Sequence, residues 1–286
     1  MNTNPQNHAL PSNIKETVSL SLKEDLGKGD LTAGLIPENT LAEATVICRE
    51  PAAIAGIAWF NEVFNQLDKS IKIDWSINDG DVIEADTILC RIIGNARNIL
   101  SGERAALNLL QTLSATATIT REYVDLIKHT QCKILDTRKT IPGLRDAQKY
   151  AVLCGGGNNH RKGLYDGILI KENHIMAAGA ITAAVNQAKQ LESGVAIEVE
   201  VENLDELREA LNAGADIVLL DNMPAETLIQ AVEINNHKAK LEASGGISKQ
   251  NIREMAETGV DFISIGNLTK NIQAIDLSMR FQQKQD

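Results

Sequence analysis

A cluster of basic residues within an acidic chain is the feature of this sequence that most clearly indicates a functional site. Residues 138–171 contain seven lysines or arginines and two aspartates, whereas the whole chain has 28 basic and 38 acidic residues and a net charge of -10. Guanidinium groups pair bidentately with carboxylates or phosphates. The glycines at 155–157 allow the backbone to approach a ligand closely. A solvated basic surface is the simplest interpretation of a charge run. Here, however, the charges alternate with Gly, Asn, His and apolar residues, so we predict an anion-binding site.

The residues that follow position 130 alternate between short apolar runs and helical patterns. Strands are expected at 132–136, 167–171, 195–202, 216–221, 240–244 and 261–266, and two of the intervening helices at 204–213 and 249–258. Apolar strands that alternate with helices predict a parallel sheet buried on both faces. Because the spacing is nearly even and no GxGxxG motif is present, we favour an α/β barrel over an open doubly wound sheet.

Every predicted strand ends in a polar, charged or glycine residue. In an α/β barrel these ends share one rim, which carries the active site. The rim residues expected to act are Arg138, Lys139, Lys171, Glu200, Asp221, Ser244, Gly245, Gly246, Gly266 and Asn267. The two glycine-containing loops follow the last two strands, where barrels often bind a phosphate.

Carboxylates at the rim suggest a metal ion. Mg²⁺ could link Glu200 and Asp221 to a phosphate-bearing ligand, since it is commonly bound by one or two carboxylates together with substrate phosphates. Glu198 and Glu202 lie on the same strand face as Glu200. We expect Glu198 to be structural and favour the same interpretation for Glu202.

Lys171 permits a competing enzymatic interpretation. A Schiff-base aldolase would place its lysine at such a strand end. That interpretation does not explain the neighbouring pairs Arg138-Lys139 and His160-Arg161. These pairs suit a substrate with several negative charges.

The first third of the chain reads as a separate domain of mixed α and β structure. Strands are expected at 43–49, 71–77 and 87–93, and a long helix capped by Ser101 at 101–129. The strand pattern resembles biotinyl and lipoyl carriers. Because the turns lack the lysine that a carrier needs, we do not favour that function.

Bulk composition excludes several classes of protein. The net negative charge argues against nucleic acids or anionic membranes as partners. No run of about 18 apolar residues is present, and the polar residues 1–13 lack the apolar stretch of a signal peptide. The four widely spaced cysteines suggest neither zinc nor disulfides. We therefore expect a cytoplasmic protein.

Several long motifs resemble the quinolinate phosphoribosyltransferase family. They are TRKTIPGLRDAQKYAV (137–152), CGGGNNHRKGLYDGILIKENHI (154–175), EVEV (198–201), LLDN (219–222) and SGGI (244–247), with EDLGKGDLT (24–32) and SGERAALNLLQTLS (101–114) before them. The resemblance implies a small N-terminal α/β sandwich domain over 1–112. An incomplete TIM-like barrel of about seven strands follows over 113–270, and a C-terminal helix over 271–286 packs back on the first domain.

The resemblance also implies a reaction. Quinolinate and phosphoribosyl pyrophosphate would give nicotinate mononucleotide, pyrophosphate and CO₂ in the presence of Mg²⁺. The dicarboxylate would be held by Arg138, His160, Arg161 and Lys171, and Lys139 would face the phosphoribosyl donor. Glu200 and Asp221 would hold Mg²⁺ and the ribose. The 5′-phosphate would lie on Ser244, Gly245, Gly246, Gly266 and Asn267.

The resemblance assigns Arg104 to the active site of a neighbouring subunit, which implies a homodimer. The sequence departs from the family pattern at Asn267 and Lys270, where a small residue and a histidine are more usual. An enzyme that uses nicotinate alone and a non-catalytic anion-binding barrel are the remaining alternatives.

Overall fold

The computed structural model describes residues 8–281 and divides the chain into two compact units. Unit 1 contains the residues up to Arg121, residues 140–156 and those from Leu268 onward, and unit 2 contains 122–139 and 157–267. The expected boundary after residue 112 falls within helix α3 (Ala96–Ile127). Part of the polar N-terminal segment (1–7) and the end of the predicted C-terminal helix (282–286) lie outside the described residues.

Unit 1 is built on an antiparallel sheet with the strand order β12-β1-β5-β3. Its strands are β1 (Leu41–Cys48), β3 (Lys72–Trp75), β5 (Thr87–Asn95) and β12 (Leu277–Phe281). The short strands β2 (Ala52–Ala53) and β4 (Val82–Ile83) form a separate pair. The other elements that begin in this part of the chain are α1 (Ile14–Leu26), the 3-10 turn η2 (Ala33–Leu35), α2 (Ile57–Leu67), α3 and α4 (Arg145–Cys154).

The long helix α3 begins earlier than the sequence predicts. The expected cap, Ser101, lies inside the helix, and its hydroxyl donates a hydrogen bond to Asp30. The side chain of Asn95 instead accepts the backbone N–H groups of Arg97 and Asn98, at 3.0 and 3.3 Å. Asn95 thus supplies the hydrogen-bond acceptor that the first turn needs, and the helix begins at Ala96.

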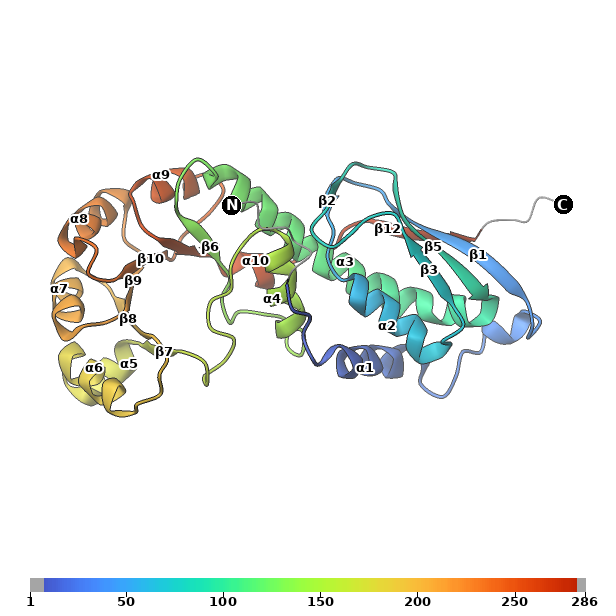
Figure 1. The fold of residues 1–286 in the computed structure, drawn as a ribbon, viewed down its shortest axis with the longest axis horizontal. Coiled ribbons are helices and arrows are strands. Elements are labelled where there is room, and N and C mark those ends of the chain that lie inside the picture. Colours follow the sequence, from blue (N-terminus) through green and yellow to red (C-terminus); the bar gives the residue numbers. More distant parts are fainter. Residues whose placement is uncertain (1–7, 282–286) are drawn as a thin grey trace. The chain divides into compact units, whose positions relative to one another are not determined.

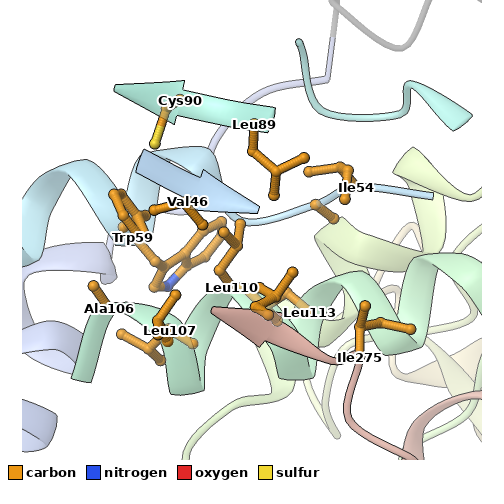
Figure 2. Packing of buried hydrophobic residues seen from close by; sticks show 14 of the residues in the cluster. Val46, Ile54, Trp59, Leu89, Cys90, Ala106, Leu107, Leu110, Leu113 and Ile275 are labelled. Atoms are coloured by element: carbon orange, nitrogen blue, oxygen red, sulfur yellow. The ribbon is translucent and has the colours of Figure 1, made fainter. Parts of the chain in front are cut away.

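An apolar core joins the antiparallel sheet to α2 and α3. Figure 2 shows Val46 and Cys90 on the strands, with Trp59 between them and the α3 residues Leu107 and Leu110. All five side chains are almost completely buried. Burial of such side chains contributes about 1.5–3 kcal/mol each relative to exposure, so this core is the main source of stability in unit 1.

The last described residues, Leu277–Phe281, form a strand, which corrects the helix predicted over 271–286 as far as the structure describes it. Strand β12 pairs antiparallel with β1, and Leu277 lies opposite Cys48. Leu277 is buried, whereas Arg280 and Phe281 are exposed. The backbone groups of this segment are satisfied by a partner more than 200 residues away in the sequence, a long-range pairing that local periodicity does not reveal.

Unit 2 contains a parallel sheet with the order β6-β11-β10-β9-β8-β7. The strands are β6 (Lys133–Leu135), β7 (Ile168–Ile170), β8 (Ile197–Val201), β9 (Ile217–Asp221), β10 (Lys240–Ser244) and β11 (Phe262–Ser264). The helices that begin in unit 2 are α5 (Glu172–Ala178), α6 (Ile181–Gln190), α7 (Leu204–Ala213), α8 (Ala225–Asn235), α9 (Ile252–Glu257) and α10 (Asn267–Lys270), and all of α10 after Asn267 belongs to unit 1. In Figure 1, α6 to α9 lie on the outer side of the strands.

The sheet is an open barrel. Within the described residues it has six strands rather than about seven, and a one-residue parallel bridge between Asn158 and Leu135 stands at the free edge of β6. Helix α7 has the predicted bounds, whereas α9 covers only the middle of the predicted 249–258. No helix within residues 8–281 is long and apolar enough to cross a membrane.

Candidate active site

Strand register places Lys171 beside Glu200. Leu169 of β7 is in register with Glu198 of β8, so the next residues on the same face, Lys171 and Glu200, also lie side by side. The Lys171 ammonium forms an ion pair with Glu200 Oε2. The lysine side chain is 46% exposed and the glutamate side chain 21%. An ion pair with this much solvent contact stabilises the fold little, which leaves both groups available for a ligand.

Asp221 ends β9 on the same face as Glu200, because Glu200 is in register with Leu219. Its Oδ2 accepts a hydrogen bond of 2.9 Å from the side chain of Asn222. Asn222 has a left-handed backbone with φ of 53°, a conformation that Asn tolerates better than most residues. Two partly exposed carboxylates on neighbouring strands fit Mg²⁺, which keeps several waters or phosphate oxygens as further ligands.

The loop after β10 requires glycine. Gly245 has φ of 89°, and a Cβ there would lie 2.1 Å from Asn222 Oδ1. Gly246 also has a positive φ, of 61°, but a Cβ at Gly246 would meet nothing within 4 Å. Left-handed glycines turn backbone N–H groups toward one side of a loop, which suits an anion.

Lys139 lies against the second predicted phosphate loop. A Cβ built on Gly266 would be 3.0 Å from Cδ of Lys139. Gly266 follows β11, and Lys139 follows β6, the strand that pairs with β11. The Lys139 side chain therefore lies at the end of the neighbouring strand. Asn267, the first residue of α10, is half-buried.

Two arginines form the cationic part of the rim. Arg161 Nη1 donates a hydrogen bond of 3.1 Å to the carbonyl of Gly167. Burial lowers the pKa of Arg161, and the positive charge of Arg138 lowers this pKa further. Glu198 and Asp166 act in the opposite direction. Two arginines whose charges oppose each other favour an anion with two negative charges.

His160 is held by contacts within unit 2. Its backbone N–H donates to Asp136 Oδ1 at 2.9 Å, and its Nδ1 accepts the backbone N–H of Arg161 at 2.8 Å. Its Nε2 lies 3.0 Å from Glu198 Oε2 and 3.6 Å from Glu242 Oε2. The imidazole thus meets buried carboxylates, and its role in substrate binding stays a prediction.

Sequence reasoning missed Glu242 and gave Asp136 no role. Both are buried, with exposures of 1% and 0%. The signal for Glu242 was its place within an otherwise apolar strand, two residues before Ser244 and therefore on the same face. Glu198 is also buried, whereas Glu202 is exposed.

Arg104 belongs to unit 1, whereas the other predicted site residues belong to unit 2. It is exposed on α3, between the buried residues Gly102 and Ala105. The structure therefore presents the Arg104 side chain to solvent.

Comparison with known proteins identifies the family. The C-terminal domain model of quinolinate phosphoribosyl transferase matches residues 116–280, and the N-terminal domain model matches residues 30–114. The chain belongs to the quinolinate phosphoribosyltransferase family.

Relatives of this family are similar along nearly their whole length. A Bacillus subtilis protein, named as a probable nicotinate-nucleotide pyrophosphorylase of the carboxylating type, is 43% identical and covers 93% of this chain and 92% of its own. A decarboxylating quinolinate phosphoribosyltransferase from Nicotiana tabacum is 38% identical over 93% of this chain and 82% of its own. The solved structure of the Francisella tularensis nicotinate-nucleotide pyrophosphorylase is 50% identical, with a TM-score of 0.91, and covers 96% and 98% of the two chains.

The fold alone does not decide the substrate. Human nicotinic acid phosphoribosyltransferase has a similar fold, with a TM-score of 0.61, at only 14% identity over 95% of this chain and 75% of its own. Discrimination between quinolinate and nicotinate therefore depends on the residues of the site.

Proposed function

We propose that this protein transfers the phosphoribosyl group of phosphoribosyl pyrophosphate to quinolinate with loss of CO₂. The products are nicotinate mononucleotide, pyrophosphate and CO₂, as in the de novo synthesis of NAD. The proposal assigns the reaction to the cytoplasm. The four buried cysteines support that location, because reduced thiols are typical of a reducing compartment.

The observation that carries the proposal is a set of cations: Lys171 is paired with Glu200 at the rim, and the positive charge of Arg138 acts on Arg161. Bringing two guanidinium groups together and partly burying them costs free energy, as the lowered pKa of Arg161 indicates. A dianion such as quinolinate offsets that cost with two carboxylates. Nicotinate, with one carboxylate, offsets less of it.

Glu200 and Asp221 are assigned to the ribose and to Mg²⁺. Displacement of pyrophosphate from the ribose C1 passes through a state with positive charge on the sugar, as in glycoside hydrolysis. The two carboxylates stabilise that charge electrostatically. Mg²⁺ held by these carboxylates would neutralise negative charge on the leaving pyrophosphate.

The loops 244–246 and 266–267 are assigned to the 5′-phosphate of the donor. The helices that follow them, α9 and α10, have six and four residues. Helix dipoles this short add little, so the binding energy comes from the loop N–H groups and the nearby ammonium of Lys139.

Decarboxylation needs no additional acid or base from the protein. Once the pyridine nitrogen carries the ribose it is cationic, and its positive charge stabilises the electron pair that CO₂ leaves at the adjacent carbon. A proton from solvent then forms the new C–H bond at that carbon. The protein holds the leaving carboxylate among fixed cations and away from water. The set of Arg138, Arg161 and Lys171 fits that task.

The proposal is tested by comparing quinolinate with nicotinate as acceptor, in the presence of phosphoribosyl pyrophosphate and Mg²⁺. Each lost charge-assisted contact costs about 1.5–3 kcal/mol, so kcat/KM for quinolinate should be at least about tenfold higher. Equal kcat/KM values for the two acceptors would favour the nicotinate enzyme instead.

The role of Lys171 separates this proposal from a Schiff-base aldolase. Lys171 acts as a charge, so treatment with borohydride and candidate carbonyl substrates should leave no adduct on it. A reduced Schiff base at Lys171, found by mass spectrometry, would contradict the proposal. Lys171→Ala should lower activity because the cation opposite Glu200 is lost.

The proposal includes a homodimer in which Arg104 completes the site of the partner subunit. The exposure of Arg104 in one chain supports this assignment. Arg104→Ala and Lys171→Ala homodimers should each be nearly inactive. After subunit exchange, a mixed dimer has one intact site, and activity should recover toward about a quarter of the wild-type value.

The control for this experiment is Arg91→Ala, because Arg91 is another exposed arginine of unit 1. That variant should be active by itself. No recovery in the Arg104 experiment, despite subunit exchange demonstrated by mass spectrometry, would mean that Arg104 does not act across an interface.

A further inference from the structure

Two buried carboxylates lie together on the inner face of the parallel sheet. Glu198 of β8 and Glu242 of β10 are 4% and 1% exposed. Oε1 of each is buried without a hydrogen-bond donor from the described residues. Burying charged groups without partners costs several kcal/mol, so the pair must be explained by what it holds.

The group held by this pair is the imidazole of His160. Its Nε2 lies 3.0 Å from Glu198 and 3.6 Å from Glu242. Because its Nδ1 accepts the backbone N–H of Arg161, the ring proton must be on Nε2, where it is donated to Glu198. His160 is therefore fixed on one side by Arg161 and on the other by the two glutamates.

These three residues could also be considered as a metal site, since their ligand atoms lie within 4.8 Å of one another. A metal would need the lone pair of His160 Nε2. While Nδ1 accepts a hydrogen bond, a neutral ring keeps its proton on Nε2 and has no lone pair there. The hydrogen bonds of the ring thus favour a network without metal.

We propose that Glu242 and Glu198 are positioning residues, which hold His160 and thereby Arg161 in the orientation that binds the substrate's carboxylates. This inference rests on the proposed function. The link from the ring to Arg161 is direct, because the ring accepts the backbone N–H of that residue. The backbone of His160 is fixed independently by Asp136.

Glu242 keeps the pair together. Burial, and then the negative charge of Glu198, raise the pKa of Glu242 to about 7, while His160 and a hydrogen bond from Ser264 act in the opposite direction. A proton on Glu242 supplies the donor that the two Oε1 atoms otherwise lack. Glu242 then donates to Glu198, whose Oε2 lies 3.0 Å from Nε2 of His160.

The kinetic test compares Glu242→Ala with Glu242→Gln. The alanine variant leaves Glu198 unsupported, so the KM for quinolinate should rise about tenfold, while the KM for phosphoribosyl pyrophosphate changes less than about twofold. Glutamine keeps the size and the hydrogen-bond donor of a protonated glutamate. It should restore the quinolinate KM to within about threefold of the wild-type value.

A second readout does not depend on activity. In ¹⁵N-detected NMR of the wild-type protein, His160 should appear as the Nε2–H tautomer, assigned by its loss in His160→Ala. Glu242→Ala should alter this signal, and Glu242→Gln should preserve it. If Glu242→Ala does not fold, Ser264→Ala serves in its place, because it removes a hydrogen bond to Glu242 and leaves both carboxylates.

Asn235→Ala is the matched control. Asn235 is a buried polar residue of unit 2, and its side chain bonds the backbone of Ala239 rather than the site. It should lower Tm without changing either KM. Equal rises of both KM values in Glu242→Ala, or no rescue by glutamine, would overturn the positioning role. A metal ion that copurifies in stoichiometric amount and is lost in Glu242→Ala would overturn it as well.

If the wild-type protein is inactive with quinolinate, the proposed function is refuted instead. The NMR result would still show whether the two glutamates orient His160.

Discussion

The antiparallel sheet of unit 1 and the parallel sheet of unit 2 carry opposite kinds of side chain on one face. In β1, the alternating residues Ala44, Val46 and Cys48 are fully buried and apolar. In the parallel sheet, the equivalent positions of β8 and β10 hold Glu198 and Glu242. One sheet gains stability from its buried face. The other gives up part of that stability to hold charge, which is the expected cost of a binding site.

This difference predicts that substitutions will separate into two classes. Changes in the apolar core should lower stability while leaving the activity of the folded protein intact. Changes on the charged face should lower activity while leaving stability nearly unchanged.

Removal of divalent metal should have the largest effect. EDTA should reduce turnover to background and Mg²⁺ should restore it, because pyrophosphate is a poor leaving group without charge neutralisation. Tm measured by calorimetry should change little, since Glu200 and Asp221 are partly exposed and do not belong to the apolar core. Full activity after metal removal would contradict the assignment of these two carboxylates.

Leu110→Ala should produce the largest loss of stability. Leu110 is fully buried in the core of unit 1, and removing a buried leucine side chain costs about 2–5 kcal/mol. Chemical denaturation should show this loss, whereas kcat per folded molecule should stay near the wild-type value. A fall in kcat without a change in stability would contradict the expectation that the core of unit 1 supports stability and not activity.

Arg161→Ala should give the opposite result. Loss of one charge-assisted contact should reduce kcat/KM for quinolinate by about 1.5–3 kcal/mol, or roughly 10- to 150-fold. Stability should not fall, because partial burial and Arg138 already disfavour the charge of Arg161. Arg253→Ala, at an exposed position on α9, is the control and should be silent in both assays.

Substitutions of the two glycines in the loop after β10 should have the smallest effect. Gly245→Ala and Gly246→Ala both place a side chain at positive φ, which costs about 1–2 kcal/mol. Only the first also creates a clash, with Asn222 Oδ1. Gly245→Ala should therefore raise the KM for phosphoribosyl pyrophosphate more than Gly246→Ala does. Equal KM values would mean that the contact with Asn222 does not shape the site.

Much of this arrangement follows from local sequence rules. The ends of β7 and β9 could be located from apolar runs, and parallel strands place those ends on one rim. That rule predicts that Lys171, Glu200 and Asp221 share one rim. In the structure Lys171 contacts Glu200, and Asp221 lies on the same sheet face as Glu200.

The features that sequence did not predict depend on long-range contacts. Strand β12 forms because β1 offers it an edge, and the sequence of 277–281 does not identify that partner. Glu242 gains its role from His160 and Glu198, which lie 82 and 44 residues away in the chain. A single buried glutamate in a strand indicates a polar partner, but only the register identifies which one.

Phosphoribosyl transfer and decarboxylation should occur together on a dicarboxylate, and the stoichiometry of the products measures this coupling. The wild-type protein is incubated with quinolinate labelled in the 2-carboxyl group, phosphoribosyl pyrophosphate and Mg²⁺, and the three products are measured. We expect equal amounts of nicotinate mononucleotide, pyrophosphate and labelled CO₂. Pyrophosphate released without labelled CO₂, or label retained in the nucleotide, would contradict it.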